Sequence, residues 1–230
     1  MSEFPYPGSA TPQYAAGIQP PWEDTSRPIF ERWWATVRGV LFAPTEFFAS
    51  MRQEAGIGAP LVFAIIGGWI GAVFSQFYSM ILNMVTSAAT AGSGEEAIGA
   101  VIGSGGLFVC ALVLGPVAVV IGSFIGAGIL HLCLMIVGGA NRPFETTFRV
   151  LTYASGATSL FGVVPLCGGA VAGIWALVAE VIGLSRAHQI GVGRAVIAVL
   201  IPIVVICGCL GALFGSAIIA LIASQTGQMR

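Results

Sequence analysis

The stretch that decides the fold is residues 175–195, WALVAEVIGLSRAHQIGVGRA. Its first half is apolar enough for a membrane, yet it contains Glu180, and Arg186, His188 and Arg194 follow in a short segment with two glycines. Arginines in short loops mark the cytoplasmic side of a membrane protein. The side on which this segment lies therefore fixes how many times the chain crosses the membrane.

The composition of the chain indicates an integral membrane protein. Of its 230 residues, 57% are hydrophobic and only 8% are charged, whereas a soluble domain carries about a quarter charged residues. So few charges cannot cover the surface of a soluble fold of this size. The net charge of −1 is unlike the strongly basic balance of nucleic-acid-binding proteins, so no nucleic-acid partner is expected.

Four long stretches contain no Asp, Glu, Lys or Arg, namely residues 55–94, 97–141, 150–179 and 195–229. A helix needs about 20 apolar residues to cross a bilayer. The first, second and fourth stretches each predict one spanning helix, near residues 60–84, 107–137 and 195–223. The third predicts either one long kinked helix or a hairpin that turns at Pro165 and the paired glycines Gly168 and Gly169. The hairpin would place helices over residues 144–164 and 168–185.

The distribution of arginine favours the hairpin. With five crossings, eight of the nine arginines lie on one side of the membrane, and only Arg230 lies on the other. With four crossings, Arg186 and Arg194 would lie outside, against the positive-inside rule. The sequence thus predicts an all-α, polytopic protein with five transmembrane helices. We expect it in the plasma membrane (the inner membrane of a bacterium), with its N-terminus in the cytoplasm and its C-terminus outside.

The region before the first span divides into two parts. Residues 1–28 are rich in proline and predict a disordered tail that acts as a tether. Residues 29–55 predict an amphipathic interfacial helix, because aromatic and aliphatic residues such as Phe30 and Trp33 recur at helical spacing. The same apolar stripe is compatible with packing against the rest of the protein. The five-helix transmembrane domain is then expected over residues 56–226.

Several kinds of catalytic site are missing from the sequence. The single aspartate, Asp24, excludes an intramembrane aspartyl protease and aspartate-rich metal sites. The absence of lysine excludes a phosphate-binding Walker loop. His131 and Cys133 are two residues apart, so they point to different sides of a helix and make a poor metal pair. No catalytic residue, metal or cofactor is predicted, and the protein is expected not to be an enzyme.

Polar residues are expected at membrane depth near the cytoplasmic ends of the helices. The candidate intramembrane cluster comprises Glu180, His131, Arg149 and Tyr153, and Glu180 would pair with Arg149 or His131. An ionisable residue inside a membrane usually faces a partner or a water-filled cavity. The cluster is interpreted either as an ion pair that joins helix ends or as a site for a proton, a small molecule or a lipid headgroup. The cytoplasmic loops contribute a second group, Arg142, Arg186, His188 and Arg194.

The sequence also resembles a known family. The residues that carry the resemblance are Phe42-Ala43-Pro44-Thr45-Glu46-Phe47-Phe48, Asn141-Arg142-Pro143-Phe144, Thr147-Phe148-Arg149-Val150-Leu151-Thr152-Tyr153-Ala154, Ile174-Trp175, Ile182-Gly183-Leu184-Ser185-Arg186-Ala187-His188, Gly193-Arg194-Ala195 and Pro202. In these segments, spread over about residues 33–225, the chain is similar to bacterial Yip-domain proteins. The resemblance implies a five-helix integral membrane protein with a cytoplasmic N-terminal region. Eukaryotic members bind Rab-type GTPases, but their acidic element has no convincing counterpart here, so GTPase binding is not carried over.

The missing catalytic sets and the resemblance together predict a non-enzymatic protein of the Yip-like type that organises the membrane as a scaffold or adaptor. The alternative is a small transporter, channel or lipid-translocating protein that uses Glu180, His131 and Arg149. Membrane lipids are expected as partners. A membrane-protein partner or a second copy of the chain is compatible with the small-residue motifs, such as Gly67-xxx-Gly71, on four of the five helices.

Overall fold

The structure is a computed structural model that describes residues 19–90 and 94–227, and in these ranges the chain is helical and has no β-strand. The elements in order are the 3-10 helix η1 (Pro21–Glu23), α1 (Ile29–Phe42), α2 (Pro44–Ser50), α3 (Gly58–Thr90), α4 (Gly94–Ile136), α5 (Phe144–Thr158), the 3-10 helix η2 (Ser159–Val163), α6 (Gly168–Ala187) and α7 (Val192–Gly227). The predicted all-α class is therefore confirmed.

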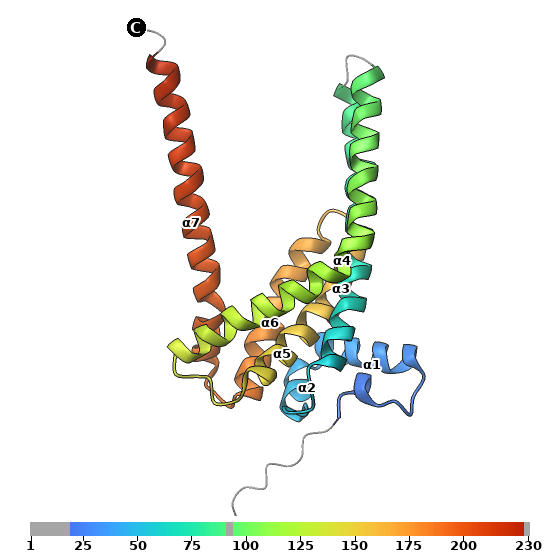
Figure 1. Cartoon of the computed structure of the whole chain (residues 1–230). Coiled ribbons are helices and arrows are strands. Elements are labelled where there is room, and N and C mark those ends of the chain that lie inside the picture. Colours follow the sequence, from blue (N-terminus) through green and yellow to red (C-terminus); the bar gives the residue numbers. More distant parts are fainter. Residues whose placement is uncertain (1–18, 91–93, 228–230) are drawn as a thin grey trace, which may run out of the picture.

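Four helices among the described residues are long and apolar enough to cross a membrane, and they lie in α3, α4, α6 and α7. Helices α3, α4 and α7 have 33, 43 and 36 residues. At about 1.5 Å per residue, each exceeds the thickness of about 30 Å of a bilayer's hydrocarbon core. In Figure 1, α3 packs along α4 while α7 projects separately on the other side of the molecule. The chain is a multi-pass membrane protein.

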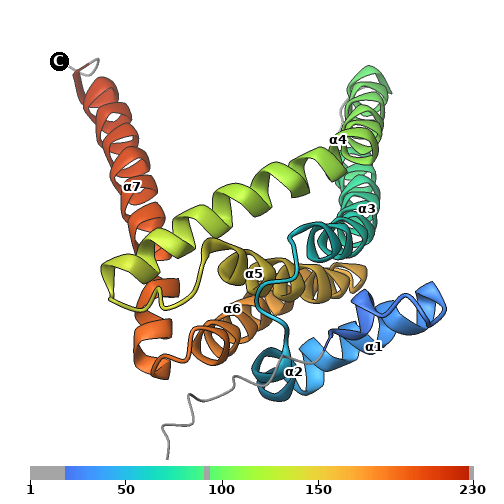
Figure 2. The same cartoon turned by 60° about the horizontal axis from the view of Figure 1, so that its bottom comes forward.

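Helix α4 is bent, and its second half runs from α3 to the foot of α7 (Figure 2). Pro116 lies inside this helix. A proline within a helix removes one backbone hydrogen bond and clashes with the preceding turn, which bends the helix. The bend lets α4 pack against α3, α5 and α7. The helix also begins at Gly94, well before the start at residue 107 that the sequence predicted.

The third charge-free stretch forms a hairpin, not one kinked helix. Helix α5 continues into η2, which ends at Val163, and α6 begins at Gly168. Leu166 in the turn has a φ of 67°. The Asn141 side-chain amide donates a hydrogen bond of 3.1 Å to the backbone carbonyl of His188. This bond ties the start of α5 to the end of α6, so the hairpin leaves and returns at the same end of the molecule.

One of the small-residue motifs lies at a close helix approach. A methyl group on Gly67 or Gly71 of α3 would overlap backbone atoms of Gly156 or Ser159, respectively, in α5 and η2. The backbones can approach this closely because glycine has no side chain. Other motif glycines face open space, and a methyl group there would meet no atom within 4 Å at Gly122, Gly169, Gly173 and Gly211. Among the motif glycines, overlap with a neighbouring backbone therefore occurs where α3 meets α5 and η2.

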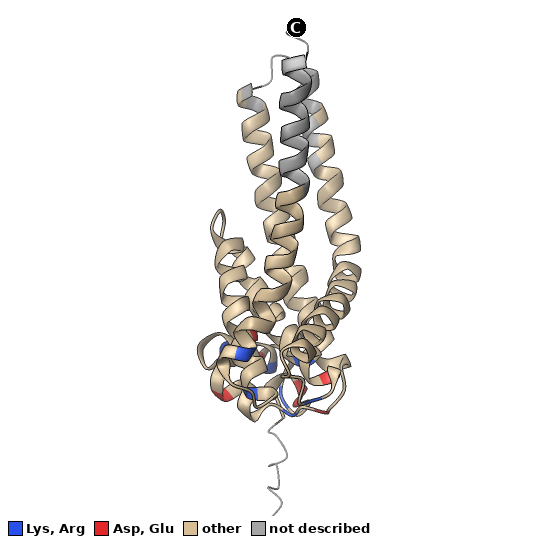
Figure 3. Cartoon of the chain, turned by 90° about the vertical axis from the view of Figure 1, so that its left-hand side faces the viewer, with Lys and Arg blue, Asp and Glu red and all other residues tan. Residues whose placement is uncertain are grey.

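The charged residues that Figure 3 colours gather at one end of the molecule, around η1, α1, α2 and the α4–α5 and α6–α7 connections. We call this the charged end. It holds much of the buried core, including Val40 of α1, Phe48 of α2 and Leu184 of α6. Helix α1 buries one face there, while Phe30 and Phe42 on it are exposed. Helix α1 runs across the direction of α3 (Figure 1).

The segment just before α1 is packed against the bundle, which corrects the prediction of a disordered tail over residues 1–28. Trp22 in η1 is only 5% exposed. Its indole N–H donates a hydrogen bond of 2.7 Å to the carbonyl of Ala59, and its ring meets the ring of Phe63 edge-on. The tail prediction is therefore wrong for residues 19–28, and residues 1–18 lie outside the described residues.

Candidate functional site

The structure divides the candidate intramembrane cluster into three separate places. Arg149 and Tyr153 lie together and share a partner, Glu23. His131 belongs to a different chain of hydrogen bonds. Glu180 lies in a cavity and has no hydrogen bond or ion pair within the described part of the chain. The predicted pairing of Glu180 with Arg149 or His131 is therefore wrong.

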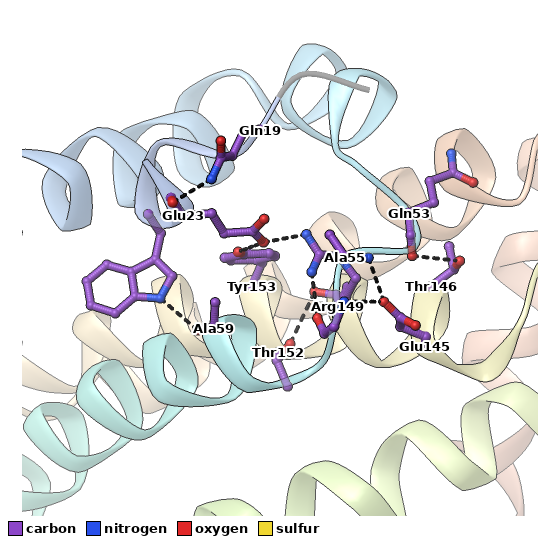
Figure 4. A network of polar contacts seen from close by, with 12 residues as sticks. Gln19, Glu23, Gln53, Ala55, Ala59, Glu145, Thr146, Arg149, Thr152 and Tyr153 are labelled. Carbon is purple, nitrogen blue, oxygen red and sulfur yellow. Dashed lines mark hydrogen bonds and ion pairs between the residues drawn. The ribbon is translucent and has the colours of Figure 1, made fainter. Parts of the chain in front are cut away.

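Arg149 is a fully buried cation in the second turn of α5, and Glu23 of η1 is its counter-charge. One guanidinium nitrogen, Nη2, donates to Glu23 Oε1, and the other, Nη1, donates to the Gly56 carbonyl at 2.7 Å. Tyr153 lies one helical turn after Arg149, on the same face, and its hydroxyl donates to the same Glu23 oxygen at 2.7 Å. Figure 4 shows η1 joined to α5 through these contacts.

The sequence did not single out Glu23, because it lies in a proline-rich segment whose composition is typical of disorder. The available signal was the residue before it. Trp22 is a large aromatic side chain, and such side chains are highly buried on average in folded proteins. Trp22 is followed directly by the carboxylate of Glu23. This pair of residues is compatible with docking of η1 against a helix that carries a buried arginine.

The start of α5 also fixes the loop between α2 and α3. The Glu145 carboxylate accepts hydrogen bonds from the backbone N–H groups of Ala55, at 2.7 Å, and Gly56, at 2.6 Å. The Thr146 hydroxyl donates to the Gln53 carbonyl at 3.3 Å. Gly56 has a φ of +88°, a backbone conformation that favours glycine. The first turns of α5 thus hold η1 and this loop together at the charged end (Figure 4).

A second buried polar chain joins α4, α5 and the end of α6. The Thr147 hydroxyl lies 2.8 Å from His131 Nδ1 and 2.9 Å from His188 Nε2, and both histidines are buried. A hydroxyl has one proton to donate, so at least one of the two imidazoles donates to Thr147. The pKa of His188 is lowered to about 4, mainly by burial and in part by repulsion from His131 and Arg142. His188 is therefore neutral at physiological pH.

The hydrogen bonds of Thr147 with the two histidines link α4, α5 and the end of α6. Two imidazoles and one hydroxyl are too few ligands for a structural zinc site, which takes four. Among the described residues, no group of three His, Cys, Asp or Glu side chains could hold a metal ion.

Glu180 is half-buried in α6 and lines a cavity of about 260 Å³ between α3, α4, α5 and α6. Three serines line the same cavity: Ser123, Ser155 and Ser159. Ser155 and Ser159 donate to backbone carbonyls of their own helical segment, so their oxygens still have lone pairs for a ligand. The cavity thus presents one carboxyl group and several hydroxyl groups.

The predicted loop residues lie at the charged end. Arg186 and Arg194 are exposed, Arg142 is half-buried, and His188 is fully buried. The turn that carries them is closed by the Ser185 hydroxyl, which donates to the Ile190 carbonyl at 2.8 Å. His188 therefore belongs to the packed interior of the charged end, Arg142 lies at its edge, and Arg186 and Arg194 are on its surface.

Comparison with known proteins gives one family. No curated protein and no solved structure matches this chain. The family model described as the Yip1 domain matches residues 38–223, which includes the end of α1, all of α2 to α6 and most of α7. The match covers Arg149, Tyr153, His131, His188 and Glu180, but not η1 or Glu23. The chain belongs to the Yip1 domain family.

Proposed function

We propose that this protein is a non-enzymatic scaffold or adaptor that presents its charged end to partners at the cytoplasmic face of a bacterial inner membrane. The observation that supports the proposal is that the buried polar side chains of the protein make hydrogen bonds within the protein. Arg149, Tyr153, His131 and His188 all bond to other segments of the protein. These bonds fix the shape of the charged end, and a fixed polar surface suits recognition of a partner.

The orientation in this proposal follows from the arginines and the hairpin. Because the hairpin leaves and returns at the charged end, α5 and α6 either both cross the membrane or both stay short of the far side. Helix α6 has the length and composition of a span, which favours two crossings and a total of five. The positive-inside rule then assigns the charged end to the cytoplasm and the C-terminus to the outside. The exposed aromatic residues Phe30, Trp34 and Phe42 of α1 fit an interfacial helix.

Photo-crosslinking in native membranes tests the scaffold role. A crosslinking amino acid replaces Arg186 or Arg194 on the surface of the charged end, and in a matched control it replaces Val113, which is exposed on α4. We expect discrete protein adducts from positions 186 and 194 that are absent from position 113. If neither surface position crosslinks to a protein, or if position 113 gives the same adducts, the scaffold proposal is wrong.

A second candidate function, transport or lipid translocation, is supported by the cavity that Glu180 lines. A carboxyl group without a partner at membrane depth is costly, and such residues often mark a pathway for protons, ions or headgroups. Glu180→Gln removes the charge and keeps the shape. Transport predicts that the purified protein moves a solute, proton or fluorescent lipid in liposomes and that Glu180→Gln abolishes this movement. The candidate fails if the unaltered protein moves none of them.

A further inference from the structure

A groove with two arginines lies beside the first turn of α3. Its volume is about 470 Å³, and its walls come from η1, α1, the loop between α2 and α3, and α3 itself. Arg32 of α1 and Arg52 of the loop both line it. Neither the scaffold proposal nor the transport candidate uses this groove.

Arg32 is held in position but lacks a full set of acceptors. Its guanidinium carbon lies 4.9 Å from the centroid of the Trp22 ring, close enough for a favourable cation–π interaction. Its Nε atom is buried and has no hydrogen-bond partner among the described residues. A buried donor without an acceptor costs free energy, and the side chain that carries this donor lines the groove.

The groove carries a net positive charge. The one carboxylate that lines it, Glu23, is already paired with Arg149 and hydrogen-bonded to Tyr153. Arg52 is exposed, and its side chain has no ion pair within the described part of the chain. The loop that carries Arg52 is fixed by the backbone hydrogen bonds to Glu145. Two arginines on fixed supports are suited to bind phosphate, because each guanidinium can donate two parallel hydrogen bonds.

The surroundings of the groove indicate that the phosphate belongs to a lipid. Val62 of α3 lines the groove and is 47% exposed, and Phe30, two residues before Arg32, is 70% exposed. Val62 lies in the second turn of α3, where this spanning helix begins, which is the depth of the headgroups in a bilayer. We propose that the groove binds the phosphate of an anionic phospholipid, with Arg32 and Arg52 as donors and the acyl chains against the exposed apolar side chains.

Native mass spectrometry of the full-length protein in detergent micelles tests this site. The ligands are phosphatidylglycerol and phosphatidylcholine, and the variants are Arg52→Gln, Arg32→Gln with Arg52→Gln, and the control Arg38→Gln. Arg38 is exposed on α1 but does not line the groove. We expect phosphatidylglycerol to bind more tightly than phosphatidylcholine. We expect Arg52→Gln to weaken its binding about fivefold and the double variant about 25-fold, from a contribution of about 1 kcal/mol per arginine. Arg38→Gln should bind like the unaltered protein.

Three results would overturn the site. The first is equal binding of the two lipids. The second is an equal loss of binding in Arg38→Gln and Arg52→Gln, which would mean attraction to the overall charge. The third is displacement of the lipid by inorganic phosphate at equal concentration, which would identify a soluble anion as the ligand. If the double variant loses its helical circular dichroism, the single variant decides the test, because the exposed Arg52 side chain bonds to no described residue.

Discussion

At the scale of single residues, the structure depends on two buried polar junctions that α5 makes with distant parts of the chain. Arg149 is paired with Glu23, 126 positions earlier in the sequence, and Thr147 bridges His131 and His188. A buried ion pair contributes little net stability compared with apolar packing, but removing one partner leaves an uncompensated charge. Each junction therefore makes packing at the charged end sensitive to single substitutions.

Replacing Glu23 tests the first junction. Glu23→Gln keeps the shape of the side chain but leaves the Arg149 cation buried without its counter-charge. We expect the free energy of unfolding, measured by titration in mixed detergent micelles, to fall by about 3 kcal/mol. The control is Glu31→Gln, because Glu31 forms only an exposed pair with Arg27 at 3.7 Å. It should cost less than about 1 kcal/mol, and equal stability of the two variants would show that the Glu23 junction is not formed.

The second junction predicts a defined dependence on pH. The pKa of His188 is about 4 in the folded protein and 6.5 without the protein environment, so between these values the unfolded chain takes up a proton that the folded protein does not. Stability is therefore complete above pH 6.5, decreases as the pH falls toward 4, and is not reduced further by this group below that. The loss amounts to at most about 3 kcal/mol.

Unfolding midpoints measured at several pH values from 7.5 to 4 check this dependence. We expect His188→Gln to be less stable than the unaltered protein at pH 7.5 but to lose less stability on acidification. Parallel pH profiles for the two proteins would exclude His188 as the group that titrates.

At the scale of elements, α5 is the helix around which the others are arranged. Its first turn holds the α2–α3 loop and bridges α4 and the end of α6, its middle holds η1, and its last turns pack closely against α3. Gly156 permits the last of these contacts. A methyl group there would lie 2.9 Å from both the backbone of Ala64 and the ring of Phe63, and a backbone atom cannot give way as a side chain can.

Gly156→Ala tests this close approach. We expect it to destabilise the protein by about 1–3 kcal/mol, which is typical of overpacking a buried contact. Gly173→Ala in α6 is the matched control, because a methyl group there meets no atom within 4 Å. The control should be neutral or slightly stabilising, since alanine favours helix over glycine. If the two variants have the same unfolding midpoint in detergent, the packing of α3 against α5 is not as described.

The helices were predictable from the sequence where charge-free runs are long, as in α3 and α7, because burial in lipid demands such runs whatever the packing. The family was also predictable, since its marks lie in short contiguous segments such as residues 182–188. The contacts of Glu180 and Arg149 could not be predicted from the sequence. Both residues lie near helix ends. Which side chains they contact depends on how α5 and α6 are rotated about their axes and on the docking of η1, which helical periodicity does not reveal. The composition of η1 gave no sign of its docking site.

At the scale of the whole molecule, the charged end and the long helices have different roles. The charged end contains the polar junctions and the arginine groove, whereas α3, α4 and α7 extend from it with exposed apolar side chains. The α5–α6 hairpin extends from the charged end along the long helices: its two ends lie at the charged end, and its turn points away from it (Figure 3). The proposed orientation requires this turn to reach the opposite side of the membrane.

The most direct test of the orientation is the accessibility of Cys167, an exposed residue in the turn of the hairpin. In one variant it is the sole cysteine, after replacement of Cys110, Cys133, Cys207 and Cys209. In the other, all five native cysteines are replaced and Arg186→Cys provides the sole thiol at the charged end. With an impermeant thiol reagent added to intact cells, we predict labelling of Cys167 without permeabilisation and labelling of position 186 only after it. Protection of Cys167 in intact cells, or labelling of both positions from the outside, would contradict five crossings with a cytoplasmic charged end.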